Sequence, residues 1–252
     1  MPNGDGRDKP DHEEVAIPLN LTTIGFDADD TLWQNEQFFR MTEDRFVALL
    51  GDHGEAAEIS GRLLEAERRN LGVYGFGIKG FMLSMIETAI EITRGQVSAA
   101  VIGEILAAGR EMAAHPVETL PHAHETLQTL AGDYRLVLIT KGDLFDQERK
   151  LAQSGLGDFF HAVEIVSDKK PETYDRIFAR HGDGAGQAMM VGNSLKSDIL
   201  PALQAGSWAV HVPHELTWVL EHAEEPAGHR RYRRIGDLGG LTGILLELGR
   251  PG

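Results

Sequence analysis

Residues 24–33, which read IGFDADDTLW, decide the fold of this chain. The apolar and β-branched run over residues 21–26 predicts a buried parallel strand. This strand ends abruptly at three carboxylates, Asp27, Asp29 and Asp30. Like charges that close repel one another, so such a cluster usually indicates a cation or a positively charged partner. The alternative interpretation is an acidic turn that only caps the next helix.

Composition limits the classes of function. The chain has 252 residues, of which 42% are hydrophobic, enough for one large domain or a domain with a sizeable insertion. It has no cysteine, which excludes disulfides and thiolate sites and is typical of a cytoplasmic protein. The net charge of −15 disfavours nucleic acid and anionic lipid as partners. Residues 1–17 are polar, and we expect a disordered leader there rather than a secretory signal.

After the first strand the hydrophobic period changes to that of helices. Helices are expected near residues 36–50, 55–70, 78–93 and 97–114, which form an all-helical block over residues 35–116. Glycines 72, 75, 77 and 80 interrupt this block once and predict a flexible loop that carries Tyr74, Phe76 and Lys79. Such a loop can close over a site and exclude water, so these three residues are candidate substrate contacts.

From residue 117 onward, short β-rich runs alternate with helices, a pattern typical of a parallel sheet with crossovers on both faces. The predicted strands cover residues 134–140, 162–166, 188–191 and 208–212, and the predicted helices cover 121–131, 145–154, 173–181, 197–205, 215–222 and 238–248. The first strand must join this sheet, because a lone parallel strand cannot bury both of its faces. We therefore expect an α/β domain made of residues 18–34 and 117–252, with the helical block inserted into it.

In an open parallel sheet, ligands bind beyond the carboxyl ends of the strands. The first four predicted strands end in polar residues, at Asp27–Thr31, Thr140–Gly142, Asp168–Pro171 and Gly192–Asp198. These segments bring carboxylates, a hydroxyl, an amide and ammonium groups to one edge. That combination suits phosphoryl transfer, which needs an oxygen nucleophile, a hard cation and donors for the phosphoryl oxygens.

These four segments resemble the four motifs of the haloacid dehalogenase superfamily. FDADDT (26–31) matches DxDx(T/V), LIT (138–140) the apolar strand that ends in a hydroxyl, KKP (169–171) the lysine before a proline, and VGNSLKSD (191–198) resembles GDSxxxD. The resemblance covers nearly the whole chain. It implies a Rossmann-like parallel sheet flanked by helices, with a helical cap of the C1 type inserted between the first two motifs.

Carried over residue by residue, the resemblance makes Asp27 the nucleophile that forms an aspartyl-phosphate and Asp29 the general acid and base. Thr31 tightens the turn beside the phosphate. Mg²⁺ is the implied cofactor, bound by Asp27, the backbone carbonyl of Asp29, Asn193 and Asp198. The implied activity is hydrolysis of a small phosphate monoester, a phosphorylated metabolite. The sequence leaves open whether the protein forms a homodimer.

Thr140 and the backbone amides of Lys141 and Gly142 would hold the phosphoryl oxygens. The third motif supplies a lysine that neutralises Asp27 and the phosphate; Lys170 is the closer match because it precedes the proline, and Lys169 is the alternative.

Two positions depart from the family pattern. Asn193 stands where the family usually has Asp, which predicts weaker Mg²⁺ binding or a larger role for Asp198. Lys141 stands where many relatives have Asn, and its ammonium could face the substrate or solvent. Dehalogenation, phosphonate cleavage, mutase chemistry and a binding protein without turnover therefore remain alternatives. Phosphonate cleavage typically needs a cap lysine, for which only Lys79 is evident.

Two further interpretations concern the C-terminal part of the chain. The last predicted strand is followed by His211, His214 and Trp218. These residues could line a pocket or pack in the ordinary way, and both interpretations stay open. The basic run at residues 230–234 is interpreted as a solvated face.

Overall fold

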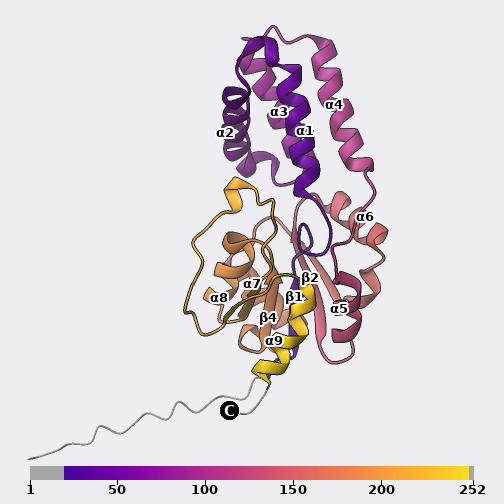
Figure 1. The fold of residues 1–252 in the computed structure, drawn as a ribbon, viewed down its shortest axis with the longest axis vertical. Helices are drawn as coiled ribbons and strands as arrows, with labels where there is room; N and C mark the ends of the chain where they lie inside the picture. Colours follow the sequence, from indigo (N-terminus) through magenta and orange to yellow (C-terminus); the bar gives the residue numbers. More distant parts are fainter. Residues whose placement is uncertain (1–19, 250–252) are drawn as a thin grey trace, which may run out of the picture.

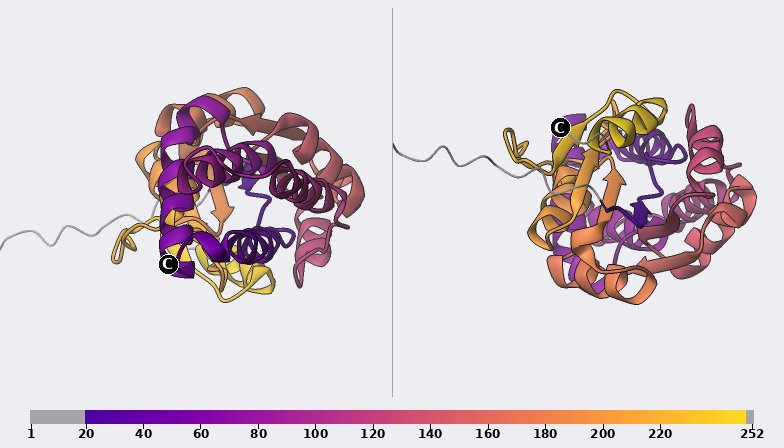
Figure 2. Two further views of the ribbon diagram at one scale, coloured as in Figure 1. Left: turned by 90° about the horizontal axis from the view of Figure 1, so that it is seen from above. Right: turned by 90° about the horizontal axis from the view of Figure 1, so that it is seen from below.

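A six-stranded parallel sheet forms the centre of the computed structural model, which describes residues 20–249. The strands lie in the order β3-β2-β1-β4-β5-β6. Figure 1 labels the central strands β2, β1 and β4, and Figure 2 shows helices around the strands in two further views. Their bounds are β1 Thr23–Phe26, β2 Arg135–Lys141, β3 Ala162–Val166, β4 Ala188–Gly192, β5 Trp208–His211 and β6 Tyr232–Arg234. This arrangement confirms the predicted fold class.

Helices cover both faces of the sheet because both faces of its inner strands are apolar. Leu136 and Leu138 of β2 pack on one side with α5 (Ala123–Leu130) and α9 (Leu241–Leu248). Val137 and Ile139 pack on the other with α7 (Pro171–His181) and α8 (Leu200–Gln204). Side chains alternate along a strand, so near-continuous apolar runs are needed to bury both faces. The remaining core helix, α6, spans Leu144–Ser154.

The topological switch point lies at β1. The neighbours of β1 are β2 and β4, and Phe26 pairs with Leu138 and Val191. Beyond this pairing β4 continues for one residue and β2 for three, so Asp27 emerges between the ends of β2 and β4. The Asp27 amide donates to the Val191 carbonyl over 2.9 Å and so extends this register by one residue.

Four helices form a separate block beyond the carboxyl ends of the strands (Figure 1). They are α1 (Glu36–Leu49), α2 (Ala56–Tyr74), α3 (Ile78–Ile92) and α4 (Ala99–Ala114). The block has its own core, which includes Phe46, Leu63, Phe81, Met85 and Ile105.

Two chain segments that pair with each other join this block to the sheet. The Gln34 amide donates to the Glu118 carbonyl over 2.9 Å, and the Leu120 amide donates to the Leu32 carbonyl over 2.8 Å. We retain the division into a core of residues 18–34 and 117–252 and a cap of residues 35–116 as a proposal.

Several predicted elements are wrong in detail. Residues 215–222 are not a helix: only Val219–Glu221 makes a 3-10 turn. Conversely, Tyr232–Arg234 forms β6 within the basic run, because Tyr232 is buried against the sheet while its neighbours face outward. The predicted helix over 197–205 is split into a π-helix, η4 (Leu195–Ile199), and α8.

The glycine-rich loop is also shorter than predicted. Helix α2 continues through Gly72 to Tyr74, and α3 begins at Ile78, so only residues 75–77 break the block. Gly75 and Gly77 have φ values of 74° and 105°, the left-handed region that favours glycine. Residues 1–17, the expected leader, lie outside the described residues. Among the helices that the structure describes, none is long and apolar enough to cross a membrane.

Candidate active site

A cavity of about 170 Å³ lies between the carboxyl ends of the strands and the helical block. Its lining includes the predicted site residues Asp27, Asp29, Thr140, Asn193 and Asp198. Residues of α1, α2 and α3 form the opposite wall. The cavity is therefore placed where the parallel sheet predicts a ligand, and the helical block shields it from solvent.

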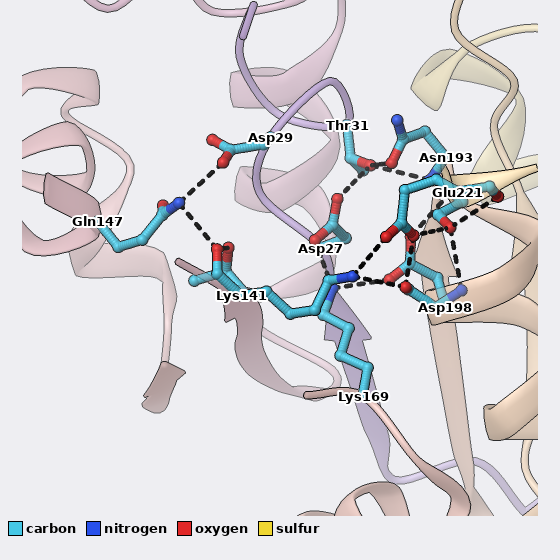
Figure 3. Close-up of polar contacts among 12 residues, drawn as sticks. Asp27, Asp29, Thr31, Lys141, Gln147, Lys169, Asn193, Asp198 and Glu221 are labelled. Atoms are coloured by element: carbon cyan, nitrogen blue, oxygen red, sulfur yellow. Dashed lines mark hydrogen bonds and ion pairs between the residues drawn. The ribbon is translucent and has the colours of Figure 1, made fainter. Parts of the chain in front are cut away.

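Asp27 is the centre of the polar network in this cavity (Figure 3). Its carboxylate is buried, with one oxygen accepting from Lys169 Nζ over 2.5 Å and the other from Thr31 Oγ1 over 3.1 Å. Lys169 Nζ also donates to Asp198 Oδ1 over 2.7 Å. One ammonium thus joins the first motif to the fourth.

The preference for Lys170 as the lysine beside Asp27 is wrong in geometry. The Lys169 side chain is 1% exposed, whereas that of Lys170 is 65% exposed and pairs with Asp168 over 3.2 Å. Lys170 has extended dihedral angles and precedes Pro171, the first residue of α7. Since successive side chains of an extended segment point in opposite directions, only one of these two lysines can enter the site.

Burial and charge act in opposite directions on this network. Burial raises the pKa of Asp27, and Asp198 raises it further, while Lys169 lowers it. For Lys169, burial lowers the pKa, but Asp198 and Asp27 outweigh it and hold the pKa above its ordinary value. Lys169 is therefore a permanent cation, and Asp27 needs additional positive charge beside it to remain ionised.

Asn193 and Asp198 are positioned by the turn after β4. Asp198 Oδ2 accepts from the Ser194 amide over 2.9 Å. The Asn193 amide donates to Thr31 Oγ1 over 3.1 Å, and that hydroxyl lies 3.4 Å from Asn193 Oδ1. A Cβ on Gly192 would clash with the Asp198 carboxylate, so glycine permits this close approach.

These oxygen atoms form a donor set that suits a hard cation. Thr31 Oγ1 contacts both Asp27 Oδ2 and Asn193 Oδ1, so a carboxylate and an amide oxygen converge from β1 and β4. Carboxylate and amide oxygens are the ligands that Mg²⁺ prefers. Within residues 20–249, no group of three or more His, Cys, Asp or Glu side chains forms a metal cluster on its own. The set fits Mg²⁺ only with the amide or backbone oxygens included.

Asp29 faces α6 and is held there by three donors that sequence reasoning missed. Its Oδ1 accepts from Lys150 Nζ and from Trp33 Nε1, each over 2.7 Å, and its Oδ2 accepts from Gln147 Nε2 over 2.8 Å. Gln147 and Lys150 are three residues apart and share one helix face. Their spacing of three residues, in the amphipathic helix that follows the second motif, is the sequence signal that could have indicated these two donors.

The end of β2 carries Thr140 and Lys141, and Gly142 follows, as predicted. The Lys141 side chain, however, has a partner that the sequence did not predict. Lys141 Nζ donates to Glu221 Oε1 over 2.7 Å and to Ser197 Oγ over 2.7 Å. Glu221 belongs to the loop after β5, in the segment that was expected to be helical. No local pattern marks Glu221, because its position depends on how this loop folds back over the sheet edge.

Of the three candidate cap residues, only Phe76 lines the cavity. Its ring lies 4.0 Å from Lys141 Nζ and 6.2 Å from the Trp218 ring. Tyr74 instead donates to Glu87 within the helical block, and Lys79 pairs with Asp143 over 2.9 Å on the outside of the cavity. Tyr74 and Lys79 therefore lie outside the cavity lining, whereas Trp218 joins Phe76 in the wall.

The model of a family of hydrolases, the haloacid dehalogenase-like hydrolases, matches residues 21–206. Over 210 residues, the chain is 26% identical to the glyceraldehyde 3-phosphate phosphatase of Methanothermobacter thermautotrophicus, covering 78% of this chain and 88% of that one. It is 23% identical to the pyrimidine 5'-nucleotidase YjjG of Escherichia coli, covering 89% and 97%.

Solved structures agree with this match. A haloacid dehalogenase-like family hydrolase from Xanthomonas campestris superimposes with a TM-score of 0.81 at 41% identity, covering 91% of this chain and 92% of that one. The family model and this relative each span most of the described fold. The chain belongs to the haloacid dehalogenase-like hydrolase family.

Proposed function

We propose that this protein hydrolyses small phosphate monoesters, with Asp27 as the nucleophile and Asp29 as the general acid and base. The observation that carries the proposal is the convergence of Asp27, Lys169 and Asp198 at the switch point of the sheet. The two relatives named as a phosphatase and a nucleotidase support it.

In the first step, a carboxylate oxygen of Asp27 attacks the phosphorus in line, and the bond from phosphorus to the leaving oxygen breaks. Asp29 gives its proton to that oxygen, so the alcohol leaves neutral. The Lys169 ammonium neutralises negative charge on Asp27 and on the phosphoryl group. Thr140 Oγ1 and the backbone amides of Lys141 and Gly142 would donate to the phosphoryl oxygens.

In the second step, the Asp29 carboxylate takes a proton from water as that water attacks the aspartyl-phosphate. The bond from phosphorus to Asp27 breaks, inorganic phosphate leaves, and the Asp27 carboxylate and the protonated Asp29 are regenerated. When bound by Asp27, the Asp29 carbonyl, Asn193 and Asp198, Mg²⁺ would supply the positive charge that these carboxylates and the phosphate lack.

The other reactions on this scaffold are less well supported. Phosphonate cleavage through a cap lysine requires a free amine in the cavity, but Lys79 lies outside the lining and pairs with Asp143. Dehalogenation has no need of a proton donor at position 29, whereas here Asp29 lines the cavity and accepts three hydrogen bonds from side chains.

The test is turnover of a panel of phosphate esters, with p-nitrophenyl phosphate as a general reporter and Mg²⁺ present. Asp27→Asn should lower kcat at least about a thousandfold, because an amide cannot accept the phosphoryl group. Asp133→Asn, which removes an exposed carboxylate far from the cavity, is the matched control. Substantial activity of the Asp27 variant would remove Asp27 as the nucleophile.

A further inference from the structure

The cavity has a strong excess of negative charge. Nine acidic side chains line it, against three lysines. A phosphate monoester carries its own negative charge, so the cavity must offset that charge locally. Lys169 can serve this purpose only beside Asp27, with which it is paired. The remainder of the substrate meets the rest of the wall.

Each of the three lysines in the lining is already in an ion pair. Lys169 pairs with Asp27 and Asp198, Lys150 with Asp29, and Lys141 with Glu221. Among the described residues that line the cavity, there is therefore no uncommitted cation for a second anionic group of a substrate.

The wall formed by the helical block adds three carboxyl groups, Glu36, Glu43 and Glu67. Of these, Glu36 has a salt-bridge partner, Arg40, at 3.0 Å. Burial, with the neighbouring Glu43 and Glu36, raises the pKa of Glu67 to about 8. Burial likewise raises the pKa of Glu36 to about 7, although Arg40 opposes it. These carboxyl groups offer no positive charge to an additional anion and repel it wherever they are ionised, whereas a neutral or cationic group meets hydrogen-bond acceptors.

Lys141 would be the natural partner for a second anion, because it follows Thr140 at the phosphate end of the cavity. Its ammonium is instead engaged by Glu221, Ser197 and the face of Phe76. The side chains of Lys141 and Glu221 are only 12% and 15% exposed. Although burial raises the pKa of Glu221, Lys141 and the hydroxyls of Ser194 and Ser197 lower it below its ordinary value. Glu221 is thus a fixed anion that neutralises Lys141.

We propose that the cavity selects phosphate monoesters whose leaving group carries no second negative charge, and that Glu221 determines this specificity by occupying Lys141. The inference rests on the proposed function. Its chemical basis is exclusion: a carboxylate or second phosphate on the leaving group finds carboxylates and a neutralised lysine, while hydroxyl, amine and uncharged ring groups meet acceptors and the Phe76 and Trp218 rings.

The first experiment compares three two-carbon esters of nearly equal size that differ in the terminal group. They are phosphoethanolamine, 2-hydroxyethyl phosphate and phosphoglycolate, which end in a cation, a neutral hydroxyl and an anion. We expect kcat/KM for phosphoglycolate to be at least about tenfold below that for 2-hydroxyethyl phosphate, with phosphoethanolamine equal to or above the neutral ester. Glycerol 3-phosphate and 3-phosphoglycerate form a longer pair for the same comparison.

Equal or faster turnover of the anionic esters would overturn the inference and leave the proposed function intact. Absence of turnover of every ester, p-nitrophenyl phosphate included, would instead overturn the proposed function, and the inference would fall with it.

The second experiment assigns the effect to Glu221. Glu221→Gln should release the Lys141 ammonium and raise the ratio of kcat/KM for phosphoglycolate over 2-hydroxyethyl phosphate at least about tenfold. Adding Lys141→Met should cancel that rise. Glu224→Gln makes the same change in charge three residues away, at an exposed position outside the lining, and should leave the ratio as it is. An unchanged ratio in the Glu221 variant would remove Glu221 as a determinant of specificity.

The ratio is measured within one variant, so a lower active fraction does not distort it. Glu67→Gln tests the opposite wall without disturbing the lysine. At pH 9, where the native glutamate is ionised, it should raise the same ratio about threefold, and at pH 6.5, where that glutamate is neutral, it should leave the ratio unchanged. If Glu221→Gln yields no folded protein, Glu67→Gln and the substrate series on the unaltered protein still show whether the cavity selects substrates by charge.

Discussion

The ammonium of Lys169 is the residue-scale feature on which the site depends. It contacts Asp27 at 2.5 Å and Asp198 at 2.7 Å, and its side chain is almost completely buried. Removing one partner of a buried ion pair leaves the other charges uncompensated, which is strongly unfavourable. The same ammonium would also stabilise the charge that develops on a transferred phosphoryl group.

A pair of substitutions separates the two adjacent lysines. Lys169→Met should lower kcat about a hundredfold or more and lower the melting temperature, because Asp27 and Asp198 lose their cation. Lys170→Met should change kcat by less than about twofold and leave the melting temperature nearly unchanged, because its partner Asp168 lies on the surface. Steady-state kinetics and thermal unfolding of both variants check this. The reverse pattern would show that Lys170 enters the site in solution.

Asp29 shows how neighbouring side chains can orient a proton donor. Lys150, Gln147 and Trp33 together occupy both of its carboxylate oxygens. We expect these residues to position Asp29 rather than to contact substrate. Gln147 Oε1 is the one buried side-chain oxygen or nitrogen within residues 20–249 that has no hydrogen-bond partner.

A positioning role for Lys150 predicts a dependence on the leaving group. Lys150→Met should lower kcat/KM at least about tenfold for an alkyl phosphate, whose alkoxide must be protonated as it leaves. It should lower kcat/KM less than about threefold for p-nitrophenyl phosphate, whose phenolate leaves without a proton. Gln147→Leu should act in the same direction, and Lys170→Met is the control. An equal loss for both esters would indicate a general structural defect instead.

At the scale of elements, the helices of the cap contribute carboxyl groups to the wall of the cavity. Glu67 of α2 lies near Glu36 and Glu43 of α1, and its pKa is raised to about 8 by burial and these neighbours. A carboxyl group with a raised pKa in the folded state binds its proton more tightly when folded than when unfolded. It therefore stabilises the fold at low pH, and that contribution is lost as the pH rises from about 4.5 through about 8.

The sign of this linkage predicts how Glu67→Gln changes stability. At pH 5 the glutamine should have little effect, because the native glutamate is also neutral there. At pH 9 it should raise the melting temperature, by roughly 2–4 °C for each kcal/mol of ionisation cost removed. Thermal unfolding across this pH range measures the difference, with Glu65→Gln, at an exposed position of the same helix, as the control. A benefit that is equal at both pH values would argue against a raised pKa.

At the scale of the whole molecule, the site exists only where distant parts of the chain meet. Asp27 follows β1, Lys141 ends β2, Lys169 precedes α7, Asp198 lies in η4, and Glu221 reaches in from the loop after β5. The cap closes the cavity from the other side with Phe76, which contacts Lys141 and lies near Trp218. A ligand that binds this junction should therefore stabilise the whole fold.

Metal binding offers a test at this scale. EDTA should stop the hydrolysis and Mg²⁺ should restore it, because the carboxylates need added positive charge. Mg²⁺ should also raise the melting temperature, with about 2.7 kcal/mol of stabilisation expected at a hundred times its Kd. KCl at equal ionic strength is the control, and Asp198→Asn should weaken the response. Full activity in chelator would exclude a required metal.

Features that rest on local pattern could be predicted from the amino-acid sequence alone. Apolar runs predicted five of the six strands, because burial on both faces requires such runs wherever the sheet lies between helices. Strand ends placed Asp27, Thr140 and Asn193 at one edge, since parallel strands align their carboxyl ends. The helical period identified the four helices between the first two motifs in the same way.

Which side chains meet in space depends on how distant segments pack, and local pattern does not report it. The short strand β6 and the non-helical segment over 215–222 depend on packing against β5 and the cavity, which outweighs weak local preference. The choice of Lys169 over Lys170 depends on which side of an extended segment faces inward. Glu221 is 80 residues away from Lys141 in the sequence, and its pairing exists because the loop folds back. Periodicity reports the burial of one element, whereas a pairing between side chains depends on the placement of two.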